Sequence, residues 1–142
     1  MDDIKKETKR AGMIETVVGV ATVALGSDTE VPVFVAPCDG KIKEVGFVPK
    51  AAITGADTNY FTLGFKNKGA AGTGTDVIAE KAYTDGIDVA AFDHEDLGTV
   101  ANNLLSEGDV VSFHKTETGN GMAMPDLIAV VVFQPYWKKW QI

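Results

Sequence analysis

Cysteine and histidine are scarce in this sequence, whose 142 residues include one cysteine, Cys38, and two histidines, His94 and His114. One cysteine cannot form an intrachain disulfide, so the fold has to be stabilised by its own hydrophobic core. The histidines lie in neither a His-x-His nor an HExxH pattern, and they are too few for a multi-histidine metal centre. We therefore expect no metal and no cofactor.

Long apolar segments are also missing. No apolar run reaches the ~20 residues that a membrane-spanning helix needs, and the first ten residues lack the apolar stretch of a signal peptide. The sequence therefore predicts a protein that is made and folded in a cytoplasm and that has no membrane partner.

Basic residues are rare in the second half of the chain, where residues 69–137 contain Lys81 and Lys115 against eleven acidic residues. With a formal net charge of −7, such a surface repels phosphate backbones, so we expect no nucleic-acid partner. Six of the 13 basic residues gather near the two chain ends, which are either solvated termini or arms that dock on an acidic partner. They include Lys5, Lys6, Lys9, Arg10, Lys138 and Lys139.

What the sequence does contain is the pattern of an antiparallel sheet. From Thr58 to Lys66, Phe61, Leu63 and Phe65 occupy alternate positions, which places them on one face of a half-buried strand. Hydrophobic residues make up 45% of the chain, and its 15 glycines stand between apolar runs, as in a globular domain with many short turns. We expect a flexible arm at residues 1–12 and a single domain at residues 13–142 that ends in an aromatic and basic tail.

Apolar segments bounded by turn residues recur along that domain, and each predicts a strand. About eight strands with turn signals every 8–12 residues indicate an all-β fold, an antiparallel β-sandwich with a jelly-roll-like topology and at most one short helical turn. The helical turn is expected within residues 91–98. The expected strands are Met13–Leu25, Val31–Ala36, Lys41–Val48, Thr58–Lys66, Asp76–Tyr83, Ile87–Phe92, Val110–Thr116 and Asp126–Tyr136.

Details of four strands follow from their patterns. The apolar set slips between Ile42 and Val45, which predicts a β-bulge, and Val17-Val18 suggests another. Residues 31, 33 and 35 are all valine and are expected on one face, while Pro32 favours an edge position. The last strand is apolar on both faces, so we expect it in the centre of a sheet.

Three features resemble catalytic or ligand-binding sites, and each has a simpler structural interpretation. Asp93-His94-Glu95-Asp96 offers metal-ligand types, but adjacent residues point in divergent directions, so a solvated acidic turn is favoured. Cys38 follows a proline in a turn without any signature of a cysteine nucleophile. Residues 69–75 are glycine-rich but lack the Gly-Lys-Ser/Thr ending of a phosphate loop, so an inter-strand loop is favoured. We expect no catalytic residues.

Candidate residues for an interface with another protein or another subunit lie mainly near the chain ends. Two indoles in the final segment are costly to expose, and the two methionines of the loop at residues 119–125 are adaptable contacts or cover the core edge. The candidates are Ile4, Lys5, Lys6, Lys9, Arg10, Met122, Met124, Trp137 and Trp140.

Five segments resemble the small head proteins of tailed bacteriophages that decorate the capsid. They are Ala36-Pro-Cys-Asp-Gly-Lys-Ile42, Ala52-Ile-Thr-Gly-Ala-Asp-Thr-Asn-Tyr60, Asn67-Lys-Gly69 with Gly72-Thr-Gly-Thr75, Glu107-Gly-Asp109 and Gly121-Met-Ala-Met-Pro125. The resemblance spans residues 30–134 and consists of turn and strand markers. It implies a non-enzymatic β-sandwich, commonly a homotrimer, that binds the major capsid protein on the outside of the virion after synthesis in the bacterial cytoplasm.

Two other classes remain open. A carbohydrate-binding sandwich would stack sugars on Tyr60, Tyr83 or Trp137 and hydrogen-bond them through Asp57 and Asn59. The segment at residues 35–48 also resembles the first half of a biotinyl or lipoyl carrier domain, but the sequence has no lysine tripeptide of the kind that carries the cofactor.

Overall fold

The computed structural model describes residues 12–136, and within that range it contains nine strands and no helix. Most of the strands end at turns that contain glycine, proline or aspartate. They are β1 (Ile14–Val20), β2 (Thr29–Val35), β3 (Gly40–Pro49), β4 (Tyr60–Gly69), β5 (Asp76–Ala82), β6 (Glu95–Asp96), β7 (Leu104–Leu105), β8 (Val110–Thr118) and β9 (Leu127–Pro135).

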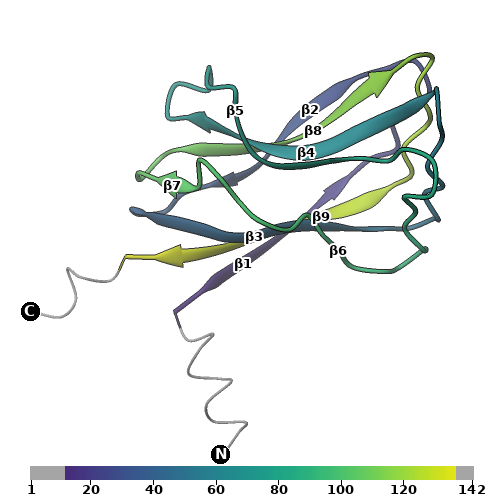
Figure 1. Ribbon diagram of the computed structural model, residues 1–142. Coiled ribbons are helices and arrows are strands. Elements are labelled where there is room, and N and C mark those ends of the chain that lie inside the picture. The colour runs from purple at the N-terminus through teal and green to yellow at the C-terminus, as the bar shows by residue number, and fades with distance from the viewer. Residues whose placement is uncertain (1–11, 137–142) are drawn as a thin grey trace, which may run out of the picture.

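The strands form two antiparallel sheets that pack face to face, as Figure 1 shows. One sheet has the order β1-β9-β3-β6, with β7 also paired to β3, and the other has the order β2-β8-β4-β5. Consecutive strands such as β1 and β2, or β8 and β9, lie in opposite sheets, so the chain behaves as a long hairpin wrapped around the core. This nested order is that of a jelly roll, and the predicted all-β sandwich is confirmed.

The core lies between the sheets and is rich in aromatic side chains. Phe61, Leu63 and Phe65 of β4 are all fully buried, which confirms the predicted inward face of that strand. Opposite them, Phe133 of β9 packs against Phe34 of β2 with ring centroids 5.2 Å apart. These contacts fix how the two sheets lie on each other.

Bulges decide which side chains face inward on two strands. The register of β3 against β9 shifts between Ile42 and Glu44, as the slipped pattern predicted. The register of β2 also shifts, between Pro32 and Phe34, so Phe34 faces the core and Val35 is exposed. The prediction that the valines at 31, 33 and 35 share one face was therefore wrong, because the extra residue reverses the alternation.

Strand β1 is shorter and more regular than the sequence predicted. It ends at Val20, and beyond it only Val23 forms an isolated bridge, with Met124. Its pairing with β9 has no register shift, so the expected bulge at Val17-Val18 does not form. The expected strand at Ile87–Phe92 is also absent, because its one ladder contact is a bridge between Val89 and Ile53.

Of the remaining positional predictions, two are confirmed and one is wrong. Strand β9 lies between β1 and β3, which confirms its central position, and β2 with Pro32 lies at a sheet edge, as expected. Residues 91–98 form no helical turn and contain β6 instead. The positive φ of Phe92 (62°) does not fit a right-handed helix, and the pairing of Glu95 with Phe47 keeps the following backbone extended.

The sandwich has two distinct ends. The turns at residues 36–39, 70–75 and 106–109 lie at the end where the chain enters β1 and leaves β9, which we call the terminal end. The four connections at residues 21–28, 50–59, 83–94 and 119–126 lie at the opposite end, which we call the loop end.

Candidate functional site

The acidic segment at residues 93–96 does not converge on a single point. The carboxylate of Glu95 accepts from the hydroxyl of Tyr83 (3.3 Å) and from Lys81 (3.4 Å), beneath the surface. Asp96 caps its own turn by accepting from the Gly98 amide at 2.8 Å, and His94 is exposed. Within residues 12–136 no three His, Cys, Asp or Glu side chains gather as metal ligands.

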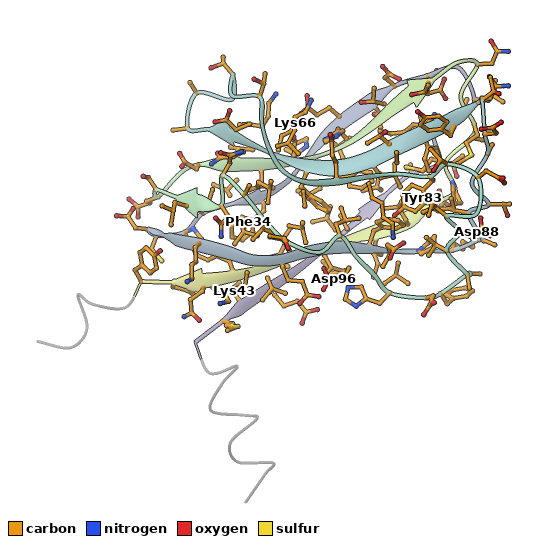
Figure 2. The ribbon with its side chains drawn as sticks, in the orientation of Figure 1. Phe34, Lys43, Lys66, Tyr83, Asp88 and Asp96 are labelled. Atoms are coloured by element: carbon orange, nitrogen blue, oxygen red, sulfur yellow. The ribbon has the colours of Figure 1, made fainter. Side chains whose placement is uncertain are left out.

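Tyr83 lies between the sheets and is not a surface residue, as Figure 2 shows. Its ring makes edge contacts with Phe47 and Phe61, at centroid distances of 6.0 and 5.8 Å. Burial, reinforced by the Glu95 carboxylate, raises the pKa of Tyr83 far above its ordinary value. Tyr83 therefore cannot stack on a sugar, and this part of the carbohydrate-binding hypothesis was wrong.

The other residues of the two alternative classes give them little support. The side-chain oxygen of Asn59 accepts from the Asn120 amide at 2.8 Å and so holds a turn together, while Asp57 is exposed and Tyr60 is partly buried. Strands β2 and β3 lie in different sheets, so the segment at residues 35–48 is a crossing between layers and not the hairpin of a carrier domain.

The other histidine is buried on the outer face of the four-stranded sheet. His114 is paired in register with Glu30 on one side and with Gly64 on the other, and Gly64 is in turn paired with Glu80. The imidazole Nε2 lies 3.2 Å from the Glu80 carboxylate, and Nδ1 is buried without a hydrogen-bond partner. Burial lowers the pKa of His114, although the contact with Glu80 opposes this.

At the loop end, a buried lysine of β8 holds the connection at residues 21–28 in place. The ammonium group of Lys115 donates to the carbonyl oxygens of Ala24 (3.2 Å) and Ser27 (2.8 Å) and to the carboxylate of Glu117. Glu117 also accepts from the Gly26 amide at 2.9 Å. The loop between β1 and β2 is therefore fixed onto β8.

The two candidate methionines differ in exposure. Met124 is fully buried in the core, and its backbone exchanges hydrogen bonds of 3.0 and 2.9 Å with Val23. Met122 is partly buried at the edge of the core. Of the pair, Met122 is the one whose side chain reaches the surface.

Comparisons with known proteins assign this chain to no family. The sequence matches no protein-family model and no curated protein. Its structure is similar to a chain in a structure of infectious bursal disease virus, Gx strain, with a TM-score of 0.39 and 12% sequence identity. The similarity covers 84% of this chain and 32% of the viral chain, so the protein spans about a third of that chain's length.

The terminal end is organised by Asp39. Its side chain accepts from the Glu107 amide at 2.9 Å, and its carbonyl oxygen accepts from the Tyr136 amide at 2.9 Å. The turn at residues 36–39 is joined to the turn at 106–109 by two further bonds of 2.9 Å, from the Ala36 amide to Asp109 and from the Gly108 amide to Ala36. These contacts tie both sheets to the exit of the C-terminal segment.

Exposed apolar side chains lie at both ends: Phe92 and Leu25 belong to the loop end, and three others lie at the terminal end. Leu104 is 68% exposed, Val35 is 59% exposed and Tyr136 is 45% exposed. Sequence reasoning missed all three, because the exposure of Val35 follows from the bulge in β2 and that of Leu104 from the two-residue length of β7. The candidates Ile4, Lys5, Lys6, Lys9, Arg10, Trp137 and Trp140 lie outside the described residues.

Charged residues are unevenly distributed between the sandwich and the segments attached to it. The four connections of the loop end contain six aspartates against one lysine, Lys50. The segments outside residues 12–136, which join the terminal end, contain six basic residues against three acidic ones. The turns of the terminal end are acidic too, with Asp39, Glu107 and Asp109 and no basic residue, so the basic residues at this end belong to the attached segments. Within residues 12–136 no helix could cross a membrane.

Proposed function

We propose that this protein is a non-enzymatic decoration protein of a bacteriophage head, which binds the outer surface of the shell and stabilises the contacts between capsid subunits. The observation that carries the proposal is the place where the two end segments of the chain join the sandwich. Both chain segments that hold the basic and indole candidates join the body at the terminal end, next to Val35, Leu104 and Tyr136.

The segments that resemble phage head proteins agree with this architecture. The first forms the turn between β2 and β3, and the third forms the connection between β4 and β5. The others fall in the connections before β4, β8 and β9. The resemblance therefore marks the turns of a jelly roll, which is the body expected for such a protein.

A rigid protein that binds across subunit contacts is physically suited to stabilising an assembled shell. A ligand that binds only the assembled shell stabilises that state by about 2.7 kcal/mol per site when its free concentration is 100 times its Kd. Many copies add these contributions over the whole shell. An acidic loop end turned toward solvent would keep decorated particles apart by charge repulsion.

Binding to shells that lack the protein tests the proposal. Purified protein is mixed with empty shells of the parent virus, the shells are sedimented, and bound protein and the thermal disruption temperature of the shells are measured. We expect saturable binding and a higher disruption temperature. Absence of binding at micromolar concentration would contradict the proposal. The homotrimer that the resemblance implies is checked by light scattering on the same preparation.

A further inference from the structure

The edges of the two sheets are protected to different degrees. Edge strands expose unpaired backbone groups, and proteins blunt them with short lengths, prolines, bulges or charged side chains. Strands β6 and β7 have two residues each, β2 carries Pro32 and a bulge, and β5 carries Glu80 and Lys81 in its second half. Three of the four edges in the described range are therefore protected.

Strand β1 is the exception. It has seven residues in unbroken register with β9, no proline, and Glu15 as its single charged residue. Val17, at its centre, is 52% exposed. Within residues 12–136 no strand pairs with the outer edge of β1. Its free backbone groups therefore present a regular template for another extended strand.

An apolar groove runs beside that edge. It lies between β1 and β2, on the open side of the sandwich, and has a volume of about 560 Å³. Ile14 and Thr16 line one wall, and Pro32, Val35 and Pro37 line the other. A partner at the edge of β1 would thus also cover exposed apolar side chains of β2.

We propose that β1 pairs antiparallel with β1 of a second copy, across a two-fold axis at Val17, and so joins the five-stranded sheets of two copies. This inference concerns contacts between copies and does not rest on the proposed function. The two grooves would lie on either side of the axis and would face each other.

The sequence of β1 is complementary to itself in this arrangement. In the register that pairs all seven residues of both strands, each residue faces the one whose number sums with its own to 34. Val17 then meets Val17 of the second copy, Thr16 meets Val18, and Glu15 meets Gly19. Because the one charged side chain of the edge faces a glycine, the pairing brings no like charges together.

The composition of the segment that precedes β1 makes it less suited than a second copy to pair with the free edge of β1. Lys5, Glu7 and Lys9 stand at alternate positions there. A strand formed by residues 4–10 would direct either these three side chains or Lys6 and Arg10 toward the apolar groove. Burial of unpaired charges makes both registers unfavourable.

The pairing is isologous, so it joins two units whether each unit is one chain or a larger ring. The test therefore compares the mass of the unchanged protein in solution with the mass of variants that cannot pair through β1. Sedimentation equilibrium is measured on the full chain and on the variants Val17→Lys and Val17→Glu, each of which places like charges on the two-fold axis. We expect each variant to have half the mass of the unchanged protein. An equimolar mixture of the two variants should regain the full mass, since opposite charges then meet.

Ala82→Lys provides the matched control, because it adds the same charge at an exposed position on the edge strand β5 of the other sheet. It should leave the mass unchanged, and circular dichroism should show the same fold for all variants. Equal masses for the unchanged protein and the folded Val17 variants would overturn the inference, as would a mixture that stays at half mass. If shell binding fails while the mass ratio holds, the proposed function falls and this inference stands.

Discussion

Lys115 and Glu117, two residues apart on β8, form an ion pair from which solvent is excluded: their side chains are 0% and 8% exposed. The pair lies at the boundary between β8 and the loop at residues 21–28. Because Lys115 also donates to two carbonyl oxygens of that loop, the ammonium group has its hydrogen-bonding capacity filled. Lys115 thus connects β8, the strand between β2 and β4, to the loop at residues 21–28.

Replacement of Lys115 by methionine should be strongly destabilising. The Glu117 carboxylate would remain buried without its cation, and removal of one partner of a buried pair costs about 3–5 kcal/mol. Urea unfolding followed by circular dichroism measures the change. Lys66→Met, at a partly exposed position on the outer face of the same sheet, serves as control and should cost less than about 1 kcal/mol. Similar losses for both variants would contradict the role of the buried pair.

Stability should fall as the pH is lowered below the ordinary pKa of histidine, and His114 should be the cause. Since burial lowers its pKa in the folded state, the folded protein favours the neutral imidazole. The stabilisation is complete above pH 6.5 and is lost as the pH falls through the lowered pKa, by about 1.4 kcal/mol for each unit between the two values. Glu80, Glu30 and Lys66 face the ring and modulate this loss.

His114→Gln should flatten the dependence of unfolding free energy on pH between 7 and 5, as measured by urea titrations at several pH values. His94→Gln, at the exposed histidine, is the control and should retain the slope of the unchanged protein. The carboxylates of Glu30 and Asp126 have lowered pKa values and act only at more acidic pH. A slope that persists in His114→Gln but disappears in His94→Gln would refute the assignment.

The two methionines of the loop end should have separate effects. Met124→Ala removes a fully buried side chain and should lower the unfolding free energy by about 2–5 kcal/mol. Met122→Ala should cost less, because that side chain is only partly buried. Because the proposed orientation turns the loop end toward solvent, Met122→Ala should bind shells as tightly as the unchanged protein. Weaker shell binding by this variant would place the loop end, and with it Met122, in the interface.

Deletion of residues 1–10 should reduce the occupancy of the protein on empty shells without unfolding the sandwich. The expectation follows from the basic residues of this segment, which would meet an acidic shell surface. A full-length variant with glutamine at Lys5, Lys6, Lys9 and Arg10 separates charge from length. Equal occupancy of the deletion variant and the full chain, measured by sedimentation, would show that this segment does not contribute to shell binding.

Local patterns were enough to predict most strands. In β4 the alternation is uninterrupted, so the buried residues could be identified from spacing alone. In β2 the same reasoning failed at Val35, because a bulge depends on pairing with β8 and leaves no mark in a run of valines and a phenylalanine. The apolar residues Val23 and Leu25 extended the predicted first strand too far, since apolar character alone does not distinguish a strand from a loop that packs on one.

Contacts between segments far apart in the chain could not be predicted from the sequence. The burial of Tyr83 depends on rings from β3 and β4, and the burial of Lys115 depends on carbonyl oxygens 88 and 91 residues earlier. The exposed residues Leu104 and Tyr136 come to the same end of the sandwich through the topology. A sequence shows which side chains are apolar, and the pairing of strands decides which of them remain uncovered.

The nested strand order has a consequence for synthesis. Strand β9 lies between β1 and β3, and β8 lies between β2 and β4, so the last two long strands to be translated join the earlier ones in both sheets. A ribosome-bound chain that stops before residue 110 can complete neither layer. Its early strands then expose apolar faces until translation has passed residue 135, and this interval is when the polypeptide most needs chaperones.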